Sequence, residues 1–176
     1  MASRRYARYV SGAMKTTGTV LIGIGNEQRG DDAAGLAVAR SLRTAPPPGW
    51  RVELASGEAT DLIARWVGAE RVIVVDAARA GGSAGTILRL DGLRAVLPAQ
   101  TRDASTHATG LAAAVRLARA LGMLPRELVL LLVCGTHWTI GTGLSPAVAA
   151  ATQRLTAQLT GGELPAVPHA QPDRFS

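Results

Sequence analysis

Apolar runs alternate with amphipathic segments along most of this chain. Three runs are apolar at nearly every position, which is typical of strands buried on both faces of a sheet. They cover residues 19–25, 71–77 and 127–135. The stretches "WRVELA" (50–55) and "TILRLDG" (86–92) predict two further strands. The second of these is short and resembles an edge strand.

Between these runs, apolar residues recur at the spacing of an α-helix. The predicted helices cover residues 32–43, 58–68, 108–122 and 145–159. Ser145 is expected to cap the last helix, with Pro146 at its first position. Strands that alternate with helices predict the α/β class, with an open, mostly parallel sheet covered on both faces. In such folds a ligand binds outside the carboxyl ends of the strands.

Length and composition indicate one domain with two polar ends. A chain of 176 residues is long enough for a single substantial core. Residues 1–17 lack an apolar period and carry several basic residues, so we expect a flexible basic tail there. Residues 161–176 are rich in proline and polar residues and are expected to form a second flexible tail. The domain itself is predicted over residues 18–160.

The net charge of +6 comes almost entirely from arginines scattered at helix-face spacings. Nucleic-acid binding needs basic residues clustered on one face, so we expect no nucleic-acid partner. No apolar stretch approaches the ~18 residues of a membrane span, so we expect no membrane partner either. Cys134, the only cysteine, lies in a buried strand, which indicates a reducing cytoplasm and no thiol nucleophile.

Polar residues cluster where predicted strands end. Asp31 and Asp32 follow the first strand, Asp76 ends "RVIVVD", and His107 precedes the third helix. Each has an ordinary interpretation: a helix cap for either acid of the first loop, an Asx turn for Asp76, a loop histidine for His107. Together, two carboxylates and one imidazole at one sheet edge form a mixed O/N site that suits a borderline divalent cation. Three protein ligands would leave positions open for reaction.

The glycine-rich turn "GIGNEQ" argues against a dinucleotide site. Gln28 stands where the third glycine of that fingerprint belongs, and the adjacent aspartates would repel a pyrophosphate. Glu53, at the end of the second strand, is the one residue able to imitate a ribose-binding acid. The turn instead lets the backbone of Asn26 approach a bound peptide closely. Gly35 is expected to let helix and sheet pack tightly.

Four stretches of the sequence resemble the hydrogenase maturation proteases. They are "VLIGIGNEQRGDDAAGLAVARSL", "VIVVDAARAGGSAGTILRL", "STHATGLAAAVRLARALG" and "GTGLSPAVAAA". The resemblance runs in order from about residue 19 to about residue 159. It implies a three-layer α/β/α fold around a twisted sheet of about five strands. The polar "EQR" differs from the apolar residues common there in the family, and the first-loop acid is often Glu.

The resemblance implies an endopeptidase, often classed as aspartic-type, that trims the C-terminus of the large subunit of a nickel–iron hydrogenase. Asp32, Asp76 and His107 would be both the catalytic residues and the residues that engage nickel. The nickel comes with the large-subunit precursor, so no tightly bound cofactor is expected in the isolated enzyme. Asn26 and Asp31 are expected to serve substrate binding, with Asp31 supporting the loop or capping the helix that begins there.

Two alternatives remain open from the sequence. A non-cleaving module could sense the metallated state of a partner, and a nucleotide-binding α/β oxidoreductase is the less favoured choice. His137, in "CGTHWTIGTG", also follows a strand and is a rival site residue. We interpret it as a loop histidine beside Trp138.

Overall fold

The computed structural model describes residues 18–79, 82–95 and 106–165, and only the backbone of residues 106–109. The predicted tails at residues 1–17 and beyond 165 lie outside this range. Of the predicted C-terminal tail, Leu164 packs against the apolar core, and Arg89 Nη1 lies 3.5 Å from the carbonyl oxygen of Pro165.

Five strands form one sheet in the described part of the chain. They are β1 (Thr19–Ile24), β2 (Trp50–Ala55), β3 (Arg71–Ala78), β4 (Ile87–Asp91) and β5 (Glu127–Cys134). Their order across the sheet is β2-β1-β3-β5-β4. β4 pairs antiparallel with β5 at one edge, and the other pairs are parallel. The predicted sheet and the edge position of its short strand are therefore confirmed.

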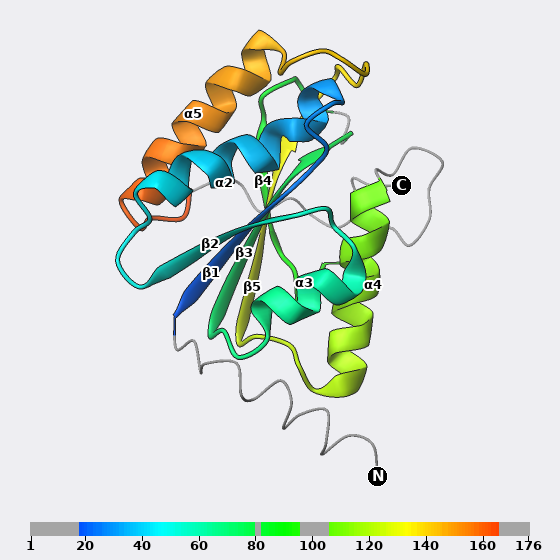
Figure 1. Ribbon diagram of the computed structural model, residues 1–176, viewed down its shortest axis with the longest axis vertical. Coiled ribbons are helices and arrows are strands. Elements are labelled where there is room, and N and C mark those ends of the chain that lie inside the picture. The colour runs from blue at the N-terminus through cyan, green and yellow to red at the C-terminus, as the bar shows by residue number, and fades with distance from the viewer. Residues whose placement is uncertain (1–17, 80–81, 96–105, 166–176) are drawn as a thin grey trace.

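Helices cover both faces of the sheet, as Figure 1 shows. A 3-10 turn, η1 (Gly30–Ala33), leads into α2 (Ala34–Thr44), which lies beside α5 (Pro146–Thr160) on one face. The opposite face carries α3 (Ala59–Trp66) and α4 (Thr106–Leu121), which also contact each other. This is the expected three-layer α/β/α arrangement. None of the described helices combines the length and apolar content needed to cross a membrane.

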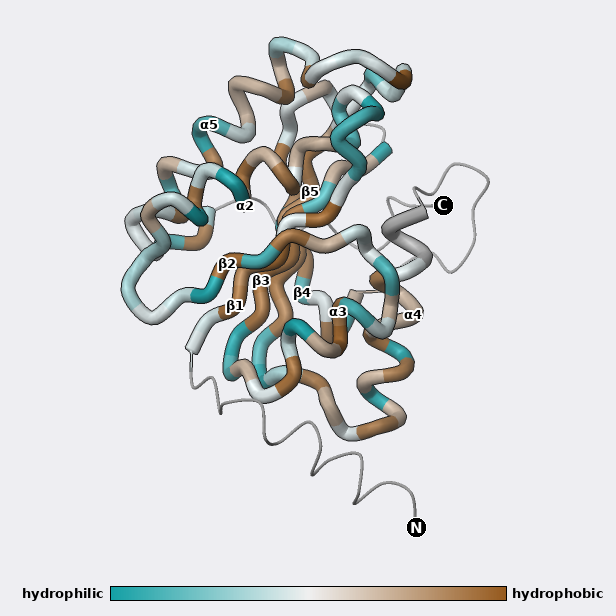
Figure 2. The backbone as a smooth tube through the Cα atoms, viewed as in Figure 1, coloured by the Kyte–Doolittle hydropathy of each residue, from teal (hydrophilic) through white to brown (hydrophobic). Residues whose placement is uncertain are grey.

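The alternation of side chains along each strand divides the core into two clusters, one on each face of the sheet. In β3, Val72 and Val74 pack toward α3 and α4, whereas Ile73 and Val75 pack toward α2 and α5. Full burial of each such side chain contributes about 1.5–3 kcal/mol before entropy is counted. Figure 2 shows the strands as a hydrophobic centre inside helices of mixed polarity.

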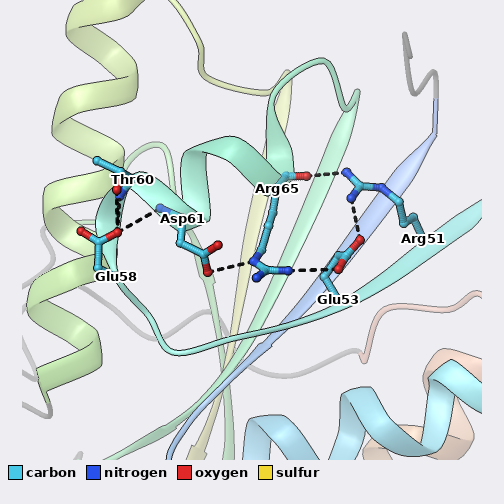
Figure 3. Close-up of polar contacts among 6 residues, drawn as sticks. All are labelled: Arg51, Glu53, Glu58, Thr60, Asp61 and Arg65. Carbon is cyan, nitrogen blue, oxygen red and sulfur yellow. Dashed lines mark hydrogen bonds and ion pairs between the residues drawn. The ribbon is translucent and has the colours of Figure 1, made fainter. Parts of the chain in front are cut away.

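Charged side chains fasten α3 to the neighbouring strand β2 (Figure 3). Arg65 bonds Asp61 at 2.9 Å and Glu53 at 3.1 Å, and Arg51 bonds Glu53 at 2.7 Å. Glu58 caps α3, because its Oε2 accepts the backbone N–H groups of Thr60 and Asp61. Glu53 therefore has two arginine partners, which leaves a ribose-binding role without support.

Gly35 allows α2 to approach the sheet closely. A Cβ at this position would lie 2.2 Å from the carbonyl oxygen of Val75 and 2.3 Å from that of Ile24. The absent side chain therefore brings the start of the helix against the carboxyl ends of β1 and β3. The packing role that the sequence suggested for Gly35 is confirmed.

Candidate active site

Two buried carboxylates lie at the carboxyl edge of the sheet. Asp32 belongs to η1, and Asp76 lies two residues before the end of strand β3. Each of the two residues is only 2% exposed. Residues of η1 contact residues of β3, so the structure brings the elements that carry these two acids together. A buried carboxylate is costly to ionise unless a cation or hydrogen-bond donors compensate for lost water. The two acids therefore mark this edge as the chemical centre of the fold.

The register of β3 sets the direction in which Asp76 points. Asp76 continues the series of Val72 and Val74, which face α3 and α4, while Ala77 continues the series that faces α2 and α5. Its Oδ1 also accepts the backbone N–H of Ala77 at 2.8 Å. Asp76 thus lies on the side of the sheet where α4 packs.

The start of α4 lies at the same edge. A Cβ at Gly110 would lie 1.9 Å from the carbonyl oxygen of Gly57, which follows the carboxyl end of β2. His107 is three residues earlier, in the first turn of α4, so the helix begins slightly before the predicted position. The side chain of His107 lies outside what the structure describes. No three His, Cys, Asp or Glu side chains that are described form a metal-holding group, and the three-residue site stays a prediction.

Asp31 is fully buried, and its carboxylate holds a distant loop. Oδ2 accepts the backbone N–H groups of Thr136 (3.0 Å) and His137 (2.9 Å) and the Ser145 hydroxyl (3.1 Å). Oδ1 accepts the Ser145 N–H at 2.7 Å. Burial by itself raises the pKa of the Asp31 carboxyl, but these hydrogen bonds outweigh burial and hold the pKa below its ordinary value.

The prediction that Asp31 caps the helix beginning beside it is wrong, because no side chain caps η1 or α2. The carboxylate instead reaches Ser145, the N-cap residue of α5. Ser145 and Pro146 occupy the predicted positions at the start of α5, but the Ser145 hydroxyl donates to Asp31 instead of capping its own helix. Sequence reasoning missed this link. The one feature of the sequence that hints at the link between Asp31 and Ser145 is "GTGLSP", in which a serine and a proline begin a helix after two glycines.

Backbone hydrogen bonds join the same two loops. Asp31 N–H donates to the His137 carbonyl at 2.7 Å, Gly30 N–H to Thr142 at 3.2 Å, and Gly141 N–H to Gln28 at 2.8 Å. The loop between β5 and α5 is therefore docked on the loop between β1 and η1, and Figure 1 shows both at one end of the sheet. This pairing fixes the rim of the site before any substrate arrives.

The remaining candidate residues have ordinary surroundings. Asn26 is exposed, and its Oδ1 accepts the Gln28 N–H at 3.0 Å, which shapes the first loop. His137 is an exposed loop residue tied by its backbone, in agreement with the loop-histidine interpretation. Cys134 is buried, and burial raises the pKa of its thiol. A thiol that resists ionisation is a poor nucleophile, so the carboxylates are better candidates than Cys134 for chemistry at this edge.

These features define a class: a three-layer α/β/α protein whose buried carboxylates lie where the parallel strands end. A carboxylate at such a site suits general-base or metal-assisted hydrolysis.

Comparisons with known proteins identify the family within this class. The model of the HycI hydrogenase maturation proteases matches residues 43–161, which is more than half of the chain. The chain therefore belongs to the hydrogenase maturation protease family, and by class it is a peptidase. The match includes Asp76 and His107, whereas Asp32 precedes it. The sequence is significantly similar to no curated protein.

Solved structures of the same kind share the fold. The hydrogenase maturating endopeptidase HybD from E. coli has a TM-score of 0.70 at 23% identity, covering 83% of this chain and 91% of that chain. The endopeptidase HycI from E. coli has a TM-score of 0.69 at 19% identity, with coverages of 89% and 99%. The NiFe hydrogenase maturation protease HybD from Thermococcus kodakarensis has a TM-score of 0.65 at 20% identity, with coverages of 84% and 100%.

Proposed function

We propose that this protein is an endopeptidase that removes a C-terminal peptide from the nickel-loaded large subunit of a NiFe hydrogenase during maturation. The observation that carries the proposal is the pair of buried carboxylates, Asp32 and Asp76, at the carboxyl edge of a fold in the hydrogenase maturation protease family. The cleaved partner is the large-subunit precursor. The cytoplasmic location of the reaction stays a prediction.

The nickel ion is part of the substrate in this proposal, and the protein supplies ligands for it. Carboxylate oxygens from Asp32 and Asp76 and an imidazole nitrogen from His107 form a donor set suited to a borderline divalent cation. Burial strengthens the attraction, because a carboxylate that is 2% exposed acts on a cation through a lower effective dielectric than water. The three residues would orient the scissile peptide, and a carboxylate would accept a proton from the attacking water.

The first loop is proposed to bind the peptide. Asn26 is exposed at this loop, so its side-chain amide is available at the surface beside the turn that it shapes. The Asp31 carboxylate faces the protein interior, so its part in substrate binding would be to hold the loop in place. Both residues would position substrate and take no part in proton transfer.

Purified protein mixed with nickel-loaded and nickel-free precursor tests the proposal by mass spectrometry. We expect loss of a C-terminal peptide from the nickel-loaded precursor alone. Asp32→Asn, Asp76→Asn and His107→Ala should each reduce cleavage at least about 100-fold. Asp91→Asn is the matched control, because Asp91 lies in β4 opposite the early residue Val129 of β5, at the other end of the sheet.

Two outcomes would contradict the proposal. Equal cleavage of the nickel-free precursor would remove nickel from the recognition step. Tight, nickel-dependent binding with no mass loss would favour a module that senses the metallated state without cutting. A metal analysis of the enzyme before mixing shows whether the nickel came from the substrate.

A further inference from the structure

The loop between β5 and α5 presents side chains that the carboxylate site does not use. Ile140 is 77% exposed, more than any other large apolar side chain of the described residues. Trp138 is half-buried, and the Arg79 guanidinium lies 4.6 Å from the centroid of its ring. Ile140 follows Trp138 by two residues, so one loop presents an exposed apolar side chain and an aromatic ring that carries a guanidinium. Tryptophan and arginine are enriched among the residues that dominate protein interfaces.

This surface is preformed. The Asp31 carboxylate and three backbone hydrogen bonds fasten the loop to the first loop, as described above. Trp138 also packs against the apolar cluster between the sheet and the helices α2 and α5. A partner that binds here meets side chains whose positions are already fixed, so little conformational entropy is lost on binding.

The surface carries positive charge that is unpaired within the ranges that the structure describes, which favours a partner with a carboxylate. Among the described residues, Arg79 contacts Trp138 and forms no ion pair. Arg29 lies between Gln28 and Gly30, whose backbone groups bond to this loop, and it too has no acidic partner in the described part of the chain. The nearest acids in the sequence are either buried, as Asp31 and Asp32 are, or paired, as Glu27 is with Arg40. The surface is therefore cationic and apolar.

We propose that Arg79, Trp138, Ile140 and Arg29 form a docking surface for a segment of the substrate protein in which a carboxylate adjoins an apolar side chain. This inference rests on the proposed function. The docking surface lies near both site carboxylates. Arg79 follows Asp76 by three residues, and Asp31, the residue before Asp32, bonds the loop that carries Trp138 and Ile140. One extended segment can therefore reach the surface and the carboxylates together. The ring of Trp138 already carries a guanidinium, which disfavours base stacking and hence a nucleic-acid partner.

Steady-state cleavage of the nickel-loaded precursor by Arg79→Glu and Ile140→Ser tests the surface. Each variant should raise KM about tenfold while kcat and Tm stay unchanged, because binding is lost in ground and transition states alike. Arg126→Glu is the control for charge, since Arg126 is exposed at the amino end of β5, the end of the sheet opposite the docking surface. Leu121→Ser is the control for apolar exposure, since Leu121 is 49% exposed on α4. Unchanged KM in both test variants would overturn the inference.

Calorimetric binding of the precursor separates this inference from the proposed function. If the wild-type protein binds the precursor without cleaving it, weaker binding by Arg79→Glu and Ile140→Ser still supports the surface, and unchanged binding overturns it. If the wild-type protein neither binds nor cleaves, both proposals fail. A concentration-dependent dimer that Ile140→Ser abolishes would assign the surface to a second copy of the chain and overturn the substrate partner.

Discussion

The two ends of the sheet treat charge in opposite ways. At the amino ends of the strands, Arg71 pairs with Glu127 at 2.5 Å and Arg126 pairs with Glu70 at 3.0 Å. All four side chains are at least 40% exposed. At the carboxyl ends, Asp31, Asp32 and Asp76 are almost fully buried. The groups that bond Asp31 there are backbone N–H groups and a hydroxyl.

The two ends differ in what compensates the charge of the acids: water at the amino ends and hydrogen-bond donors of the protein at the carboxyl ends. Exposed ion pairs keep most of their water and contribute little to stability. A buried carboxylate loses that water, so the fold must supply donors in fixed positions, as it does for Asp31. Asp31 and Asp32 are adjacent in the sequence, yet Asp31 joins loops while Asp32 belongs to the candidate site. Of these two adjacent carboxylates, Asp31 therefore has a structural role, and Asp32 is a candidate for the chemistry.

Replacement of Asp31 should produce the largest loss of stability. Asp31→Ala leaves the N–H groups of Thr136, His137 and Ser145 without their buried acceptor, and we expect a loss of about 3 kcal/mol. Asp31→Asn should lose about 2 kcal/mol, because its amide NH₂ must face at least one of these donors. Urea unfolding followed by circular dichroism measures both. Loss of less than 0.5 kcal/mol in Asp31→Ala, on the order of a typical surface substitution, would contradict the structural role.

Gly35→Ala should come next. The new Cβ would meet two backbone carbonyl oxygens, which cannot move aside as a flexible side chain does, so α2 must shift away from the sheet. We expect a loss of about 2 kcal/mol in unfolding free energy. Gly143→Ala is the matched control, because a Cβ there meets nothing within 4 Å. Equal losses in the two variants would show that the close approach is not what matters.

Acid should reduce the contribution of Asp31 to the free energy of unfolding. The folded state holds the pKa of Asp31 below its ordinary value of 3.8, so its contribution to stability is fully present above about pH 5 and is lost as pH falls through the folded pKa. The difference in stability between wild type and Asp31→Asn should therefore shrink from pH 5 toward pH 3. Urea unfolding at each pH measures it. A difference that grows as pH falls would reverse the sign and refute the assignment.

The amino edge should give the smallest effect. Glu127→Gln removes an exposed charge opposite Arg71, and we expect a loss of about 0.2–1 kcal/mol that disappears at high salt. The measurement is urea unfolding at low and high ionic strength. A loss as large as that of Asp31→Ala would erase the contrast between the two edges.

Local patterns in the sequence were sufficient for the elements of this fold. Continuous apolar runs predicted β1, β3 and β5 to within a residue or so, because a strand buried on both faces must be apolar at every position. The start of the first helix was less accurate, since the chain forms a 3-10 turn at Gly30–Ala33 before α2 begins. Asp32 and Asp76 were placed correctly at the carboxyl edge, because parallel strands bring their ends together. The position of the His107 side chain stays a prediction.

The sequence by itself determined which segments form strands and helices, that the sheet is mostly parallel, and which polar residues follow its strands. Only the tertiary structure decided the partner of each polar group. Asp31 bonds residues 105 to 114 positions away, and no periodicity connects side chains at such a separation. A helix cap and a link between two loops require the same residue type, so the sequence could not distinguish them. The folded chain could, because the β5–α5 loop brings three N–H donors to one buried carboxylate.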